Sequence, residues 1–141
     1  MPKKTIPDPE DINSLAIIDG ALHRVNRKGR AVMRHAPIGT AVVQFLNRGG
    51  KLIVREHEFG FLPGFSNLYC LDEALRLIWF AELPGENDLY AGTVREDAGM
   101  LVCDSAEGFA CCIDPASGKI QSKERQSRAA GVLAGSQTSA G

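Results

Sequence analysis

The sequence has no long hydrophobic run, because its longest apolar stretches, such as the one within Leu75–Phe80, are interrupted within a few residues. A helix that crosses a membrane needs about 20 consecutive apolar residues, so the sequence predicts no membrane span and no membrane partner. The first nine residues carry charge but lack the apolar segment of a secretory signal. Together these two absences predict a cytoplasmic protein.

A surplus of one charge sign is also missing. The 16 lysines and arginines nearly balance the 17 acidic residues, and the formal net charge is −1. Without a broad positive field, a protein is not steered to nucleic acid or to an anionic membrane. The basic run between Arg24 and Arg34 has no aromatic residue among its charges, and we interpret it as a solvated face. No nucleic-acid partner is predicted.

Motifs for catalysis and metal binding are absent as well. The sequence has no phosphate-binding loop, no dinucleotide fingerprint and no G-x-S-x-G. Its four cysteines lack C-x-x-C spacing, and we interpret them as reduced, buried side chains of predicted strands. In Glu56-His57-Glu58, strand alternation puts the two carboxylates on one face and the imidazole on the other, which disfavours a shared metal ion. No metal and no cofactor are predicted, and a protein without enzymatic activity is favoured.

What the sequence does contain is a hairpin pattern that occurs three times. Each copy has alternating apolar residues, then Asn or Asp, then a tight polar turn and a second alternating strand. The Asx positions are Asn26, Asp72 and Asp114, which lie 46 and 42 residues apart. Repeats of this length that contain only strands are typical of β-repeat architectures. The Asx side chains are predicted to bond backbone amides of their turns.

Around these hairpins the pattern predicts an all-β protein of about eleven strands, with little or no helix. Two to three antiparallel, four-stranded meander units are expected, the first of them with only three strands. The last unit is expected to begin with a strand over 88–94. A single β-repeat domain is predicted over residues 14–124, after an extended N-terminal arm (1–13) and before a flexible, Ala/Gly/Ser-rich tail (125–141).

The third hairpin also carries a family resemblance. Asp114-Pro115-Ala116-Ser117-Gly118-Lys119 is similar to the outer hairpin of quinoprotein-type (PQQ-like) β-propeller blades, which reads Asp, two variable residues, Thr/Ser-Gly-Lys and then Trp four residues past the Gly. Ser122 stands in place of that Trp, whereas the second hairpin keeps Trp79 and lacks the Gly. The resemblance covers about residues 15–123 and implies a small bacterial protein of blade-like repeats.

A closed propeller needs 4 to 8 blades, more than this sequence provides. The units are therefore expected to form a partial propeller, or to pack as a sandwich or barrel. Because the quinone of the family's enzymes lies where many blades meet, the resemblance implies no such cofactor here.

The most distinctive segment is an insertion in the second unit, 59–65, with three phenylalanines, a leucine, two glycines and a proline. Apolar side chains are costly to expose without a purpose, and aromatic residues dominate interface hot spots. The predicted partner-binding residues are Phe59, Phe61, Leu62 and Phe65, with Glu56 and Glu58. The alternative is that these rings fold back onto the core.

These observations favour a non-catalytic protein-binding module, such as an inhibitor, an immunity-type protein or an accessory subunit. A first alternative is a small-molecule-binding or enzymatic domain in which His57, Cys103 and Asp104 converge on a pocket. A second is a structural β-repeat protein that self-associates, as a homodimer, through paired edge strands.

Overall fold

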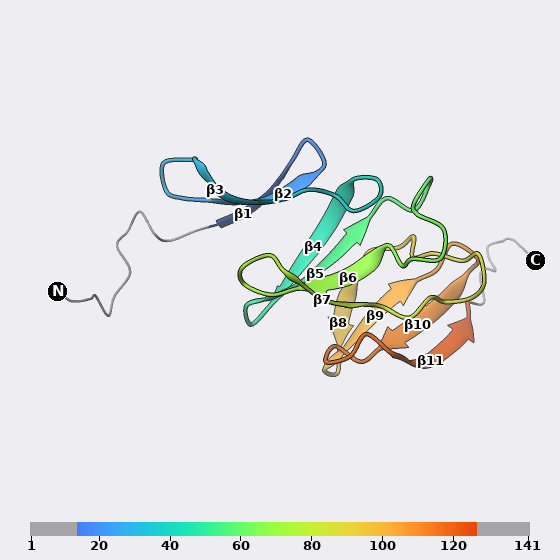
Figure 1. Ribbon diagram of the computed structural model, residues 1–141. Coiled ribbons are helices and arrows are strands. Elements are labelled where there is room, and N and C mark those ends of the chain that lie inside the picture. The colour runs from blue at the N-terminus through green and yellow to red at the C-terminus, as the bar shows by residue number, and fades with distance from the viewer. Residues whose placement is uncertain (1–13, 127–141) are drawn as a thin grey trace, which may run out of the picture.

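The computed structural model describes residues 14–126 and contains eleven strands in three antiparallel sheets (Figure 1). The predicted arm (1–13) and the tail from residue 127 onward lie outside the described residues. No helix occurs within 14–126, as the sequence predicts. The first sheet has three strands, β1 (Ser14–Ile18), β2 (Ala21–Val25) and β3 (Ala31–His35), in sequence order.

The second and third sheets each have four strands in sequence order. The second comprises β4 (Val42–Arg48), β5 (Lys51–Glu56), β6 (Leu68–Leu71) and β7 (Leu77–Phe80). The third comprises β8 (Arg95–Asp97), β9 (Met100–Asp104), β10 (Phe109–Ile113) and β11 (Ile120–Arg125). The predicted four-stranded meander units are confirmed, and the first sheet is one strand short of the other two.

The three repeated hairpins have the same local structure. Asn26, Asp72 and Asp114 each accept a hydrogen bond, through the side-chain Oδ1, from the backbone N–H two residues ahead, at 2.8–3.0 Å. Each hairpin also has a register shift just before its Asx residue, at Arg24/Val25, Cys70/Leu71 and Cys112/Ile113. The Asx side chains are turn residues, as the sequence predicts.

The motif residues of neighbouring units contact one another. Gly118 has a φ of +80°, and a Cβ added to it would lie 2.5 Å from Cε3 of the Trp79 ring. The indole Nε1 of Trp79 donates a hydrogen bond to the carbonyl of Pro115 at 3.3 Å. The glycine of the third hairpin therefore receives the tryptophan of the second, which explains why both residue types belong to the pattern.

The expected strand over 88–94 is wrong. This segment is irregular, and the first strand of the third sheet is β8, Arg95–Asp97. Tyr90 and Val94 are buried as the apolar pattern suggests, but side-chain amides rather than a neighbouring strand satisfy their backbone groups. Both groups of Val94 bond to the Gln44 side chain at 2.8 Å, and those of Tyr90 bond to Asn67.

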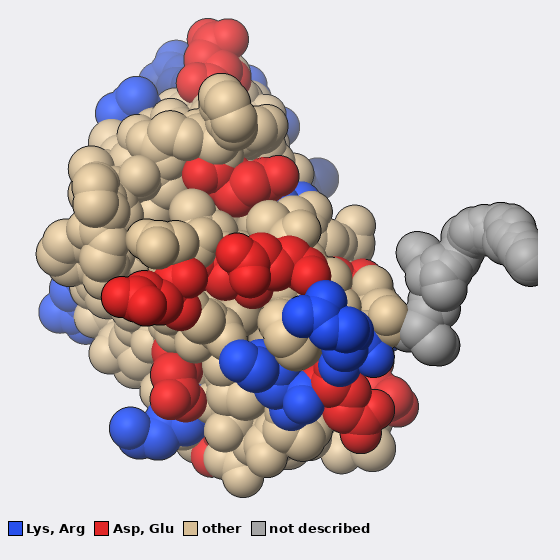
Figure 2. All heavy atoms as spheres, turned by 90° about the vertical axis from the view of Figure 1, so that its right-hand side faces the viewer, with Lys and Arg blue, Asp and Glu red and all other residues tan. Residues whose placement is uncertain are grey.

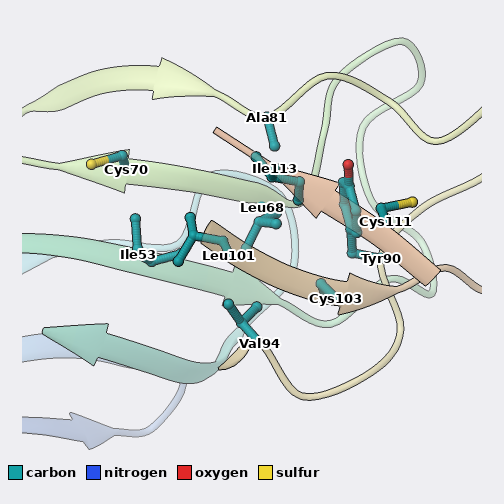
Figure 3. Close-up of a cluster of buried hydrophobic side chains, with 10 residues drawn as sticks. All are labelled: Ile53, Leu68, Cys70, Ala81, Tyr90, Val94, Leu101, Cys103, Cys111 and Ile113. Carbon is teal, nitrogen blue, oxygen red and sulfur yellow. The ribbon is translucent and has the colours of Figure 1, made fainter. Parts of the chain in front are cut away.

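The sheets stack face to face, so the middle sheet is buried on both sides. One cluster lies between the first and middle sheets. It contains Leu22 of β2 and, from the middle sheet, Val42, Leu52, Val54, Tyr69 and Leu71. Ile53 of β5 and Leu68 and Cys70 of β6 face the third sheet and belong to a second cluster (Figure 3). The other members of this cluster are Ala81, Tyr90, Val94, Leu101, Cys103, Cys111 and Ile113. Burying both faces explains the nearly continuous apolar runs of β5 and β6.

Candidate partner-binding site

The insertion over residues 59–65 lies in the connection between β5 and β6, at the end of the molecule shown on the right in Figure 1. Two consecutive tight turns shape it, closed by hydrogen bonds from Phe61 N to Glu58 O and from Phe65 N to Leu62 O, both 3.2 Å. Gly60 and Gly64 take the left-handed φ values, +84° and +81°, that the third position of a type II turn requires. The insertion is thus built with a defined backbone.

The apolar side chains of the insertion divide between surface and core. Phe59 is 85% exposed, Phe65 is 49% exposed and Leu62 is 39% exposed. Phe65 also contacts Phe80, with ring centroids 5.7 Å apart. Phe61, by contrast, is only 7% exposed, and a Cβ on Gly39 would lie 2.7 Å from its ring. The assignment of Phe61 to the contact surface is corrected: its ring anchors the loop, as the alternative reading of the insertion expects.

Glu56 is corrected in the same way, because its side chain is completely buried. Its carboxylate accepts hydrogen bonds from the backbone N–H groups of Ile38, Gly39 and Thr40, at 2.6–2.9 Å. It also accepts a bond from the Tyr69 hydroxyl. Four donors satisfy a charge that burial would otherwise penalise. Glu56 therefore fastens the segment between the first and second sheets to the start of the insertion, and it has no free surface for a partner.

The Tyr69 hydroxyl joins Glu56 to the first sheet. Its oxygen lies 2.6 Å from Nε2 of His35, and because the hydroxyl proton goes to Glu56, the imidazole is the donor of this second bond. Burial and the neighbouring carboxylate raise the pKa of Tyr69. Burial lowers the pKa of His35, against the opposing pull of Glu56. The network therefore joins β3, the segment 38–40, β5 and β6.

The second predicted acidic residue, Glu58, stays at the surface. Its side chain is partly exposed, and Oε1 lies 3.6 Å from Nη1 of Arg55. Of the predicted contact residues, Phe59, Leu62, Phe65 and Glu58 lie at the surface, whereas Phe61 and Glu56 support them from below.

Beside the insertion lies a hollow of about 390 Å³ that sequence reasoning missed. One wall is the second turn of the insertion, 61–65, and the other is the segment 83–89, which leads from the second sheet to the third. The proline and glycine of Pro84-Gly85-Glu86-Asn87 are typical of a turn, but nothing in the sequence indicates which loop this turn faces. Figure 2 views this end of the molecule and shows Asp and Glu side chains gathered in a band across it.

The alternative site of His57, Cys103 and Asp104 gains no support from the geometry. The Cys103 thiol donates to the carbonyl of Gly92 at 3.2 Å, and burial raises its pKa to about 12. Such a thiol stays protonated at neutral pH and is a poor nucleophile. His57 has a different neighbourhood, because its Nδ1 accepts a bond from Phe59 N at 3.1 Å. Within residues 14–126, no group of three or more His, Cys, Asp or Glu side chains is placed to hold a metal ion.

No family model matches the sequence, and no curated protein matches it. Among solved structures, the chain is similar to BamB from Moraxella catarrhalis, with a TM-score of 0.55 and 20% identity over 82% of this chain and 34% of that one. It is also similar to glutaminyl cyclase from Myxococcus xanthus, with a TM-score of 0.47 and 15% identity, over 87% of this chain and 54% of that one. No helix of the described region is long and apolar enough to cross a membrane.

The chain spans about a third of the length of BamB, which is a PQQ-like β-propeller repeat protein. At 20% identity the likeness concerns the fold alone. It agrees with the three stacked meander sheets and with the Asx hairpins that each of them carries. The three sheets of this chain are therefore arranged as the blades of a partial β-propeller, and the blade-like fold expected from the hairpin motif is confirmed.

Proposed function

We propose that this chain is a non-catalytic protein-binding module, and that its contact surface is the outer side of the β5–β6 connection, with Phe59, Leu62, Phe65 and Glu58. Inhibitor, immunity-type protein and accessory subunit are the roles this proposal covers.

The observation that carries the proposal is the contrast between an exposed side and a fixed base. Phe59 is 85% exposed, yet it stands between Glu56, which holds four hydrogen bonds, and the buried ring of Phe61. A loop already held in one conformation loses little entropy when it binds. Exposed aromatic side chains on such a loop are the usual centres of interface affinity.

A pull-down from native lysate, read by mass spectrometry, tests this proposal. The test variant is Phe59→Ser/Leu62→Ser, which alters exposed side chains and leaves Phe61 and the turn glycines in place. Ile78→Ser is the control, because Ile78 is also an exposed apolar residue but lies on β7. The expected result is a stoichiometric protein partner that the unaltered chain and the control retain and the test variant loses. Equal capture by all three proteins would place the contact elsewhere.

A further inference from the structure

The third sheet lies at one end of the stack (Figure 1), so one of its faces is turned away from the middle sheet. Cys111 and Ile113 of β10 pack towards the middle sheet, and the alternate residues Ala110 and Cys112 therefore lie on this outward face. Their cross-strand partners on β9 and β11 lie there too: Val102, Asp104, Ser122 and Glu124. Of these residues, Val102, Ala110 and Cys112 are apolar and only partly buried.

The first sheet lies at the other end of the stack and has an outward face of its own. Leu22 of β2 packs towards the middle sheet, so His23 and Val25 lie on the opposite side. Their cross-strand partners on β1 and β3 lie there as well: Ser14, Ala16, Ala31 and Arg34. Within residues 14–126, no other sheet covers either outward face.

The repeat relates the outward face of the third sheet to a contact that the chain already makes. Cys70 and Cys112 each stand two residues before the Asp of their hairpins, and their partners on the preceding strand are Ile53 and Val102. Cys70 and Ile53 pack against the third sheet. The outward face of the third sheet therefore has the same register as the face by which the middle sheet contacts its neighbour.

The outward face of the first sheet corresponds to the other half of that contact. Val25 stands directly before Asn26, as Ile113 stands directly before Asp114, and Ile113 packs against the middle sheet. The two ends of the stack are thus complementary in register. A first sheet can pack on a third sheet of another copy as the third sheet packs on the middle one.

The charges of the two faces are complementary as well. The outward face of the third sheet has three acidic residues and one basic residue: Asp97, Asp104, Glu124 and Arg95. The three strands of the first sheet contain no acidic residue, and Arg34 lies on the outward face. Arg27 and Arg30 are exposed in the β2–β3 turn. Opposite charges on two faces favour their association.

The contact within the chain also indicates where these charges meet. The turn of the third hairpin lies against β7, since Gly118 receives the Trp79 ring. The same stacking between copies places the basic turn of the first hairpin against β11, where Glu124 is exposed.

We infer that the outward face of the first sheet binds the outward face of the third sheet of a second copy of this chain. The contact is head to tail, because the two faces differ. It goes beyond the proposed function, since it uses the two ends of the stack and not the β5–β6 connection.

Sedimentation velocity of the full chain over a wide range of concentrations tests the inference, with the variants Val102→Glu and Val25→Glu. Each variant alters one outward face and leaves the other intact. The unaltered chain is expected to associate as its concentration rises, and each variant alone to remain a single chain with an unchanged melting temperature. An equimolar mixture of the two is expected to form pairs and nothing larger, because one intact face of each kind remains.

Ile78→Glu, which adds the same charge at an exposed position of β7, is the control and is expected to associate normally. A single-chain mass of the unaltered protein at every concentration would overturn the inference. So would association of either variant alone, which would indicate like faces or edge strands as the contact, or a mixture that forms no pairs.

Ser122→Trp is expected to strengthen the association at least tenfold. Ser122 is opposite Cys112 as Trp79 is opposite Cys70, and a Cβ at Gly29, the counterpart of Gly118, would meet nothing within 4 Å. The new indole can therefore pack on Gly29 of the other copy. Adding Val25→Glu is expected to abolish the gain, and a gain that persists would contradict the head-to-tail contact.

Cys112 gives an independent measurement, because it lies within the proposed contact. Its alkylation by iodoacetamide is expected to be fast in dilute protein and to slow as the concentration rises, whereas in Val25→Glu the rate is expected to be independent of concentration. A constant rate in the unaltered chain, under conditions in which it sediments as more than one copy, would overturn this placement of the contact.

Discussion

The side chain of Asn67 substitutes for a β-strand along the backbone of Tyr90. Its Oδ1 accepts the Tyr90 N–H at 2.9 Å, and its Nδ2 donates to the Tyr90 carbonyl at 2.8 Å. The same Nδ2 donates to the carbonyl of Glu56 at 2.7 Å. One buried amide thus joins the two ends of the insertion to the chain that leads into the third sheet.

Asn67→Ala is expected to lower the free energy of unfolding by about 3 kcal/mol or more, because it leaves the buried backbone groups of Tyr90 and Glu56 without partners. Urea denaturation monitored by Trp79 fluorescence measures this loss. Asn47→Ala is the control, since the side chain of Asn47 accepts a hydrogen bond from the exposed amide of Gly50 in its own turn, and the substitution is expected to change stability by less than about 1 kcal/mol. Equal effects of the two substitutions would contradict this role of Asn67.

Gly118→Ala is expected to destabilise the protein more than Gly29→Ala. Both glycines have a φ of +80°, so an alanine carries a similar backbone penalty of about 1–2 kcal/mol at either position. A Cβ at Gly29 meets nothing within 4 Å, whereas one at Gly118 collides with the Trp79 ring. Overpacking of this kind adds about 1–3 kcal/mol. Equilibrium unfolding of the two variants isolates the contact between neighbouring units as the difference between them.

Glu56→Gln is expected to cost about 2–4 kcal/mol of stability, because an amide NH₂ then faces donors that the carboxylate had accepted. Glu58→Gln is expected to change stability by less than about 1 kcal/mol, since its ion pair with Arg55 is partly exposed. Thermal unfolding of the two variants checks the contrast. Similar melting temperatures for both would mean that the buried network of Glu56 contributes little.

The pKa of His35 leads to an expected pH dependence. Burial lowers it below 6.5 in the folded protein, so between these two pKa values the unfolded chain binds more protons than the folded one. The stability from neutral His35 is then complete above about pH 6.5 and is lost as the pH falls through the folded pKa. Urea unfolding at pH 7.5 and 5 measures the loss, and His35→Gln, which keeps a donor but does not titrate, is expected to reduce it. An unchanged pH dependence in that variant would assign the loss to other groups.

Thiol reactivity is expected to separate Cys112 from the other three cysteines. Cys70, Cys103 and Cys111 are buried, and burial raises the pKa of Cys103 to about 12 and that of Cys111 to about 11. Cys112 is partly exposed on the opposite face of β10. Brief treatment of the native protein with iodoacetamide is expected to modify Cys112 alone, and treatment in urea to modify all four. Peptide mass spectrometry reads the positions, and rapid native labelling of Cys103 would contradict the burial of the third sheet's core.

Local patterns predicted the fold well because its elements are local. The Asx turns at Asn26, Asp72 and Asp114 are specified by neighbouring residues, and a meander needs little information beyond its turns. The segment 88–94 was misassigned for the opposite reason, since the hydrogen-bond partners of Tyr90 and Val94 are side chains 23 and 50 residues away. The apolar pattern of this segment indicates burial, but burial alone does not distinguish a strand from an irregular buried segment.

The candidate site was predicted in part. The composition of the insertion indicated exposed aromatic residues, and Phe59 and Phe65 are exposed. It gave no sign that Phe61 turns inward, because that depends on the close approach of Gly39. The sequence did not indicate the burial of Glu56 either. Its hydrogen-bond donors are backbone N–H groups at 38–40, which lie in a different connection, between the first and second sheets. The hollow needed two loops whose adjacency only the folded chain reveals.

The two separate cores give the protein an uneven tolerance to change. A substitution in the first sheet disturbs only the cluster around Leu22, and one in the third sheet disturbs only the cluster around Leu101, whereas β5 and β6 contribute side chains to both. Within one chain, the outer sheets are therefore free to diverge independently of each other. The middle sheet has to pack against two neighbours at once, and the insertion connects β5 and β6, the two strands that are least able to vary.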